Sequence, residues 1–296
     1  MQAKIAVIGS DSFIAKYIVK ALSSEFQITG FSKNNITNVK NHIVFDYPNI
    51  NLDFNTLLIF DHIIYCAGAG IQNSKNDTSL VYDLNTFLPI EIVLFLNSNT
   101  YKGKFITFGS YFEIGNNSQD KMYSENDIVS SLLTVPNHYC SSKRLLSRFF
   151  HSSQLSIKYY HLILPTIFGK GENENRLIPY LVNSLINLKD PLLTSGRQVR
   201  QYLHAFDLSD LVKTIIKMDL TGDIYNIPSK ETVQVNNIVE QVYSILNIEK
   251  AEANNVTIRY DESMQHLELN SIKLSSLIPF WEPTISVKSG IQEYIN

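Results

Sequence analysis

Tyr139 and Lys143 are the residues whose types and spacing most directly suggest catalysis. They stand four positions apart at the start of the apolar-periodic segment Tyr139–Phe150, which predicts a helix with both side chains on one face. A tyrosine is a poor acid or base near neutral pH because its ordinary pKa is about 10. A nearby ammonium and a positive nicotinamide ring favour the phenolate and lower that pKa. The spacing alone also fits an ordinary surface pair, so other motifs must decide.

A hydroxyl that could act with this pair follows the predicted strand Lys104–Phe108. If the strand ends at Ser110, this side chain lies at the carboxyl edge of a parallel sheet, where ligands bind in α/β folds. There it would donate a hydrogen bond to a carbonyl or hydroxyl oxygen of a substrate. The alternative is a turn residue without a catalytic role.

A strand-to-helix turn near the N-terminus predicts a dinucleotide site. Gly9 and Ser12 take small positions in this turn, and Phe13 and Ile14 begin the predicted helix. Small residues let the backbone approach a pyrophosphate, and the helix start directs free N–H groups toward it. The turn has one glycine where the usual pattern has three, so its position at the start of an alternating strand and helix pattern carries the prediction.

The residues after the second predicted strand bear on the choice of cofactor. A carboxylate there binds the ribose 2′-hydroxyl of NAD, whereas a basic group accommodates the 2′-phosphate of NADP. Ser32 and Lys33 occupy this place and no carboxylate does. We therefore expect NADP(H) to be preferred and NAD(H) to be possible. Lys33 could equally be a solvated loop charge.

Strands alternate with helices in the first half of the chain, which predicts an α/β fold with a doubly wound parallel sheet. The predicted strands are Ile5–Ile8, Gln27–Phe31, Ile43–Phe45, His62–Cys66, Lys104–Phe108 and Tyr160–Leu164. The predicted helices are Phe13–Leu22, Leu84–Leu96, Tyr139–Phe150, Leu177–Leu188, Asp207–Met218 and Asn236–Leu246. We expect a dinucleotide-binding domain over 1–165, with returns near 201–225, and a smaller C-terminal substrate-binding α/β lobe over most of 166–296.

Composition excludes several classes of protein. The net charge of −3 and the absence of any Lys/Arg run argue against a nucleic-acid partner. Cys66 and Cys140 are the only two cysteines, so a disulfide framework is not expected. We find no stretch near the ~18 apolar residues that span a bilayer, and no signal peptide pattern. We therefore expect a soluble cytoplasmic protein with no membrane partner and no metal site.

The order of these motifs along the chain resembles the extended short-chain dehydrogenase/reductases of the NAD-dependent epimerase/dehydratase family. The motifs in order are the glycine turn, Asp46-Tyr47, Ala67-Gly68, Asn85, Ser110, Tyr139 with Lys143, and Pro165-Thr166. Three later segments resemble UDP-galactose 4-epimerase and its relatives. They are Val199–Leu208, Tyr225–Ser229 and Phe280–Pro283. The resemblance thus covers nearly the whole chain and implies a Rossmann-like fold.

The resemblance also implies roles for individual residues. Tyr139 would be the acid/base, Lys143 would lower its pKa and hold the nicotinamide ribose, and Ser110 would polarise the substrate oxygen. The cofactor site would add Gly9, Ser12, Phe13, Ile14, Ser32, Lys33, Asp46, Tyr47, Ala67, Gly68, Asn85, Pro165 and Ile167. The site for a nucleotide-diphosphate sugar would add Tyr111, Thr166, Arg176, Leu177, Leu193, Thr194 and Arg200. Arg200 suits a diphosphate because of its fixed fork of donors, but a surface salt bridge is the alternative; Leu177 could simply be core.

Three reactions share this scaffold, and the catalytic strand separates them in part. In dehydratases of the family that this chain resembles, the strand is followed by a Thr-Asp-Glu motif with two carboxyl groups. Here Tyr111 and Phe112 stand in place of the two acidic residues, and Glu113 lies one position too far along the chain. Leu193–Gly196 with Arg200 resembles CDP-paratose synthase and related reductases. We therefore predict reduction of a 4-keto group on a nucleotide-linked 6-deoxyhexose, dTDP- or CDP-linked. The alternatives are a 4-epimerase that retains NAD and a dinucleotide-binding regulator without turnover.

The resemblance finally implies a homodimer, formed through the helix that carries Tyr139 and the helix before it. Four apolar residues of the tyrosine helix permit such an interface or could pack on the chain's own sheet. They are Leu145, Leu146, Phe149 and Phe150.

Overall fold

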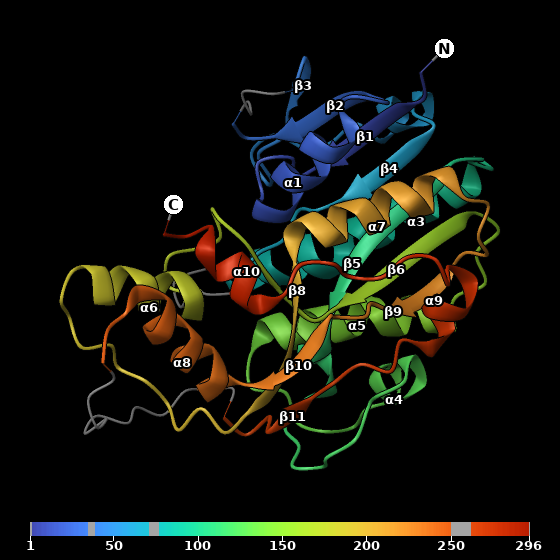
Figure 1. Cartoon of the computed structure of the whole chain (residues 1–296). Coiled ribbons are helices and arrows are strands. Elements are labelled where there is room, and N and C mark those ends of the chain that lie inside the picture. Colours follow the sequence, from blue (N-terminus) through green and yellow to red (C-terminus); the bar gives the residue numbers. More distant parts are fainter. Residues whose placement is uncertain (1, 35–38, 71–76, 250–261, 296) are drawn as a thin grey trace.

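The computed structural model describes residues 2–34, 39–70, 77–249 and 262–295. Its largest element is a sheet of seven strands in the order β3-β2-β1-β4-β5-β6-β9, and every neighbouring pair is parallel (Figure 1). The strands are β1 Lys4–Ile8, β2 Gln27–Ser32, β3 Asn41–Val44, β4 His62–Tyr65, β5 Lys104–Ser110, β6 Lys158–Leu164 and β9 Asp223–Asn226. This order confirms the Rossmann-like fold predicted from the sequence.

The central strands are apolar because both of their faces are covered. All seven residues of β5 are buried, as are four of the five residues of β1. The strand order reverses between β1 and β4, because the chain after β1 leads to β2 on one side and the chain after β4 leads to β5 on the other. Such a reversal creates a crevice at the carboxyl ends of the two strands. The register pairs Ser110 with Leu164, which places the ends of β5 and β6 level with each other.

Helices cover both faces of the large sheet. On one face α1 (Phe13–Leu22) lies beside α7 (Ala205–Lys217), and on the other face α3 (Leu88–Ser98) and α5 (His138–Ser152) pack against the strands. Leu146 and Phe150 of α5 are buried against this sheet, so they are part of the chain's own core rather than an interface. Leu145, on the outward face of α5, is exposed.

A second, four-stranded sheet and three helices build the smaller lobe. Strand β8 (Val199–His204) is its centre and pairs with β7, β10 and β11. The other elements of this lobe are β7 Thr166–Phe168, β10 Glu231–Gln234, β11 His266–Leu267, α6 Leu177–Ile186, α8 Val235–Leu246 and α10 Val287–Gln292. The region near 201–225 was expected to return to the dinucleotide-binding domain. Its first residues belong to β8 of the smaller sheet, whereas α7 and β9 lie with the large sheet. In Figure 1 helix α10 lies between the α6–α8 pair and the large sheet.

Short elements complete the chain. They are the 3₁₀ helices η1 Phe54–Ile59 and η3 Tyr111–Ile114, the π-helical turn η2 Asp83–Phe87, and the helices α2 Thr78–Tyr82, α4 Glu125–Val129 and α9 Ile272–Leu277. Helices α2 and α3 join through η2 into one segment of 21 residues, Thr78–Ser98, which is long and apolar enough to cross a membrane by length and composition. This corrects the expectation that no stretch approaches that length. Val81, Ile92 and Leu96 of the segment pack in the core of the chain.

Candidate functional site

The turn after β1 passes very close to the chain that follows β4. Gly9 has a φ of +77°, and a Cβ atom added there would lie 2.4 Å from the backbone nitrogen of Ala67. Its own N–H donates to the carbonyl of Phe31 at 2.7 Å, which fixes the turn to β2. A side chain is therefore excluded at Gly9 by both conformation and space.

The start of α1 is open to a ligand. Ser12 is the N-cap residue of this helix, but its side chain makes no capping bond, and its buried Oγ has no partner within the described residues. Phe13 and Ile14 follow it, and all three line one cavity. An uncapped helix start with an unsatisfied hydroxyl fits an anionic group such as a pyrophosphate.

Asn85 organises the opposite wall of this cavity. Its side chain is fully buried, accepts from the N–H of Ala69 at 3.0 Å and donates to the carbonyl of Ala69 at 2.9 Å. It also donates to Ser142 Oγ of α5 at 3.0 Å. Asn85 thus ties the loop after β4 to the helix that carries Tyr139.

One cavity of ≈ 540 Å³ joins the start of α1 to Ser110, Tyr139 and Lys143. It lies at the carboxyl ends of β4, β5 and β6, where the fold predicts a ligand site. The site residues predicted from the sequence that line it are Ser12, Phe13, Ile14, Ala67, Gly68, Asn85, Ser110, Tyr139, Lys143, Pro165, Thr166, Ile167 and Arg176. Its lining fits a nicotinamide dinucleotide, because the uncapped helix start and Tyr139 line the same space.

Five predicted cofactor residues do not line this cavity: Gly9, Ser32, Lys33, Asp46 and Tyr47. Ser32 is buried, and its hydroxyl accepts from Ser10 Oγ at 2.9 Å and donates to the carbonyl of Asn34 at 2.7 Å. The Ser32 hydroxyl is thus bonded within the protein, and its predicted place in the cofactor site stays a prediction. Lys33 forms an ion pair with Asp46 at 3.0 Å, and Tyr47 is hydrogen-bonded to Asp83.

Ser110, Tyr139 and Lys143 meet at the end of β5. Asn137 caps α5 by accepting from the N–H of Cys140 at 2.9 Å, so Tyr139 lies in the first turn of the helix. Lys143 Nζ donates to the carbonyl of Phe108 at 2.8 Å, one turn later. Helix α5 and strand β5 therefore bring the three side chains together, as their spacing predicts.

Burial shifts the pKa values of this group. It raises the pKa of Tyr139 well above its ordinary value, while a hydrogen bond with Ser110 and the charge of Arg176 act in the opposite direction. Burial lowers the pKa of Lys143 to about 8. The predicted lowering of the tyrosine pKa therefore depends on further positive charge, which a nicotinamide ring would supply.

A buried polar network supports Ser110 from behind. Glu113 accepts from the backbone N–H of Ser110 at 2.6 Å and from the hydroxyl of Ser147, which in turn contacts His161 Nε2 at 2.8 Å. Burial raises the pKa of Glu113 to about 7. Glu113 does not line the cavity, in keeping with its displaced position in the sequence. The physical reason is its role as partner of the N-cap residue of η3.

A second cavity, of ≈ 140 Å³, opens between the sheet edge and the smaller lobe. The residues predicted to bind a nucleotide sugar that line it are Thr166, Arg176, Leu177, Leu193, Thr194 and Arg200. Phe112, Thr166 and Arg176 line both cavities, so the two cavities adjoin. A ligand that extends from one to the other passes the Arg176 guanidinium.

Tyr111 is the predicted substrate residue that lies away from both cavities. Its side chain is fully buried, and its hydroxyl lies 2.5 Å from Thr166 Oγ1, outside the lining of both cavities. Residue 111 begins the 3₁₀ helix η3, which turns Tyr111 inward and Phe112 outward. Several residues that line the two cavities were not among the predicted site residues, although Phe112 and Tyr202 lie within segments that carry the resemblance. They are Phe112, Glu172, Asn173, Asn175, Gln198, Tyr202 and Asn236.

Comparisons with known proteins agree with this arrangement. Residues 5–228 match the model of the NAD dependent epimerase/dehydratase family. The human dTDP-D-glucose 4,6-dehydratase is 28% identical over 200 residues, which cover 65% of this chain and 55% of that enzyme. The chain thus spans about half the length of that relative. CDP-abequose synthase of Salmonella muenchen is 20% identical and matches 79% of this chain and 76% of its own length.

Solved structures share the fold over the whole chain. UDP-glucuronic acid 4-epimerase from Bacillus cereus, in complex with UDP-glucuronic acid and NAD, has a TM-score of 0.81 and 18% identity, covering 99% of this chain and 98% of that one. dTDP-glucose 4,6-dehydratase from Bacillus anthracis, in complex with NAD, has a TM-score of 0.77 and 19% identity, covering 99% and 95%. Because the family model matches most of the chain, from the dinucleotide turn through β9, this protein belongs to the NAD dependent epimerase/dehydratase family.

Proposed function

We propose that this chain is an enzyme that reduces the 4-keto group of a nucleotide-diphospho-4-keto-6-deoxyhexose, with NADP(H) as the preferred cofactor. The observation that carries the proposal is the lining of the first cavity. Ser110, Tyr139 and Lys143 face the same space as the dinucleotide turn, and no carboxyl group of the described residues lines it.

The three side chains supply hydrogen bonds and a proton. A reduced nicotinamide, when bound, supplies a hydride for the carbonyl carbon. Ser110 Oγ donates a hydrogen bond to the carbonyl oxygen, and Tyr139 Oη delivers the proton that completes the new hydroxyl. Lys143 holds the nicotinamide ribose and stabilises the phenolate that Tyr139 leaves behind.

Dehydration fits this cavity poorly, although dehydratases are among the matched relatives. Elimination needs positioned acid and base groups beside the sugar carbon atoms that lose water. Tyr111 is buried on Thr166, Phe112 presents an apolar ring, and Glu113 faces the core. The carboxylate that lines the second cavity, Glu172, is paired with Arg176.

The second cavity supports a diphosphate-linked sugar as substrate. Arg176 and Arg200 both line it, and planar guanidinium groups suit the bidentate recognition of phosphate oxygens. Relatives named for dTDP-glucose and for CDP-abequose support a dTDP- or CDP-linked substrate. Lys33, whose side chain is 63% exposed, would meet the 2′-phosphate of NADP, since an exposed pair with Asp46 opens at little cost.

The test is NADPH oxidation, followed by the loss of its absorbance, with dTDP-, CDP-, UDP- and GDP-linked 4-keto-6-deoxyhexoses. We expect oxidation with the dTDP- or CDP-linked member. Interconversion of saturated nucleotide sugars by enzyme with tightly bound NAD would contradict reduction and indicate a 4-epimerase. Cofactor binding without turnover of any sugar would indicate a regulator.

A further inference from the structure

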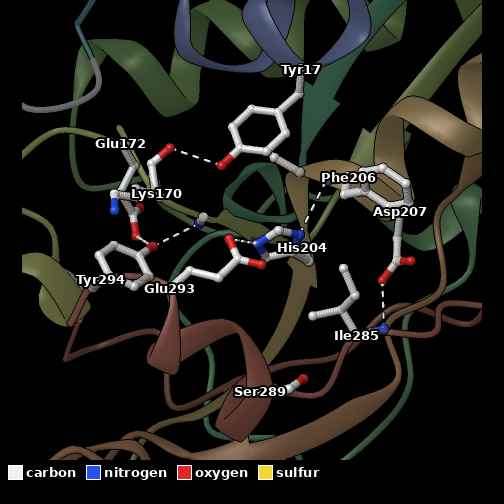
Figure 2. A network of polar contacts seen from close by, with 12 residues as sticks. Tyr17, Lys170, Glu172, His204, Phe206, Asp207, Ile285, Ser289, Glu293 and Tyr294 are labelled. Atoms are coloured by element: carbon white, nitrogen blue, oxygen red, sulfur yellow. Dashed lines mark hydrogen bonds and ion pairs between the residues drawn. The ribbon is translucent and has the colours of Figure 1, made fainter. Parts of the chain in front are cut away.

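The loop that presents Arg176 is fastened by the end of the chain. This loop, residues 169–176, connects β7 to α6. The Tyr294 hydroxyl accepts from the N–H of Gly169 at 2.7 Å and donates to Glu172 Oε1. Figure 2 shows Tyr294 directed at this loop from just beyond α10, while Tyr17 of α1 approaches it from the other side. The Tyr17 hydroxyl donates to the carbonyl of Lys170 at 2.8 Å.

Glu172 links the Tyr294 hydroxyl to the guanidinium group of Arg176. Its side chain is 2% exposed, and its Oε2 atom lies 2.8 Å from Arg176 Nε. Burial raises the pKa of Glu172, while Arg176, Tyr294 and the N–H of Gly169 lower it. A buried carboxylate is stable as an ion only with such partners. The side chains of Glu172, Arg176 and Tyr294 therefore form one unit.

The pairing through Nε determines which atoms of Arg176 face the cavities. The ion pair of Arg176 with Glu172 is made at Nε, 2.8 Å from the carboxylate oxygen. The side chain is 23% exposed and lines both cavities. A guanidinium held by Nε presents both terminal amino groups in a fixed direction, as a bidentate contact to a phosphate group requires.

The end of the chain is itself held in place beside this unit. Glu293 Oε2 lies 3.2 Å from Nε2 of the buried His204, at the end of β8, and α10 packs on β8 and α8. The segment around α10 therefore connects the smaller lobe to the Arg176 loop.

We propose that Glu172 and Tyr294 are positioning residues that orient the Arg176 guanidinium toward the diphosphate of the nucleotide sugar. This inference rests on the proposed substrate class. Tyr294, near the C-terminus, then contributes to substrate affinity and not to cofactor binding or to the chemical step. Loss of the Tyr294 hydroxyl leaves Glu172 with one partner fewer, so Arg176 loses its fixed orientation.

The test compares Tyr294→Phe with wild type by titration calorimetry, using dTDP, CDP, UDP and GDP as probes. We expect the Kd of the diphosphates that wild type binds to rise roughly tenfold, because a charge-assisted hydrogen bond is lost. The Kd of NADPH should stay unchanged, which also shows that the variant is folded. For the reductase reaction the variant should raise KM with little change in kcat, and Glu172→Gln should behave alike.

Tyr17→Phe is the matched control, because it removes the other hydroxyl that holds the loop without touching Glu172. It should leave diphosphate affinity unchanged. A double-mutant cycle completes the test: in an Arg176→Ala background, Tyr294→Phe should have no further effect.

Three outcomes would overturn the positioning role. They are wild-type diphosphate affinity in Tyr294→Phe, an equal loss in Tyr17→Phe, and an undiminished effect of Tyr294→Phe without Arg176. If wild type binds NADPH but none of the four diphosphates, the proposed substrate class fails and the inference fails with it. This failure to bind diphosphates is seen in wild type, whereas the three outcomes above are seen only in the variants.

Discussion

The two cavities place their functional groups by different means. In the first, Ser110 stands at the end of a fully buried parallel strand, and Tyr139 and Lys143 stand one helical turn apart on α5. In the second, Arg176 lies on a loop and is held by Glu172 and, through it, by Tyr294. Backbone hydrogen bonds of a strand and a helix thus place Ser110, Tyr139 and Lys143, whereas side-chain contacts hold Arg176.

Each cavity nevertheless depends on a buried carboxyl group next to it. Glu113 bonds the backbone of Ser110 and has a pKa near 7, while Glu172 bonds a guanidinium group and remains an ion pair. The difference follows from their partners, because an N–H and a hydroxyl compensate a buried charge less than a guanidinium does. The catalytic side should therefore respond to pH more strongly than the substrate side.

The largest effect is expected at the group that moves the proton. Tyr139→Phe should lower kcat about 10³-fold, since a positioned acid/base contributes roughly 10²–10⁴-fold. Dinucleotide and nucleoside diphosphate affinities should remain close to wild type. Steady-state kinetics together with calorimetry measure both, and a variant with near-normal kcat would show that Tyr139 is not the acid.

Glu113→Gln tests how much Glu113 contributes to the pH dependence of the free energy of unfolding. The pKa of Glu113 is about 7 in the folded chain and 4.5 ordinarily, so between these values the folded chain keeps a proton that the unfolded chain has released. The free energy of unfolding should therefore fall as pH rises from 4.5 to 7, by on the order of 3 kcal/mol in wild type relative to Glu113→Gln. Urea unfolding of both proteins at pH 5 and pH 8 measures this, and parallel pH profiles would refute it.

Gly9→Ala tests whether close backbone approach builds the dinucleotide end. The new Cβ atom would clash with Ala67, so we expect a loss of about 1–3 kcal/mol in the free energy of unfolding and weaker NADPH binding. Gly171→Ala is the control: its φ is also positive, at +91°, but nothing lies within 4 Å of the new atom. Equal losses in both variants would assign the effect to backbone conformation alone.

The smallest effect is expected at Lys33, at the exposed rim of the cofactor side. Lys33→Ala should raise the KM for NADPH a few fold and leave that for NADH unchanged, because only NADPH carries a 2′-phosphate. Kinetics with the two cofactors measure the ratio. An equal change in the KM for NADPH and for NADH would show that Lys33 does not contact the 2′-phosphate.

The same contrast explains what could be predicted from the sequence. Gly9, Ser12, Ser110 and Tyr139 follow from strand-turn-helix periodicity, which fixes the carboxyl edge of the sheet. Periodicity cannot tell which of two adjacent residues faces the cavity once a strand gives way to a 3₁₀ helix, and here Phe112 lines the cavity while Tyr111 is buried.

Contacts between distant segments could not be predicted at all. Tyr294 and Glu172 are 122 positions apart, and no local pattern marks either of them. The same holds for Ser32: its place at the end of a strand is visible in the sequence, but its bonds to Ser10 and Asn34 are not.

The most direct test of the central claim is the fate of the hydride. NADPH carrying deuterium at the transferred position of the nicotinamide ring, prepared for each face, is mixed with the dTDP- or CDP-linked 4-keto-6-deoxyhexose in a single turnover. Product analysis by nuclear magnetic resonance should find deuterium at C4 of the sugar for one face and not for the other. A sugar product without deuterium at C4 from either cofactor would contradict the assignment of this cavity to reduction of a 4-keto group.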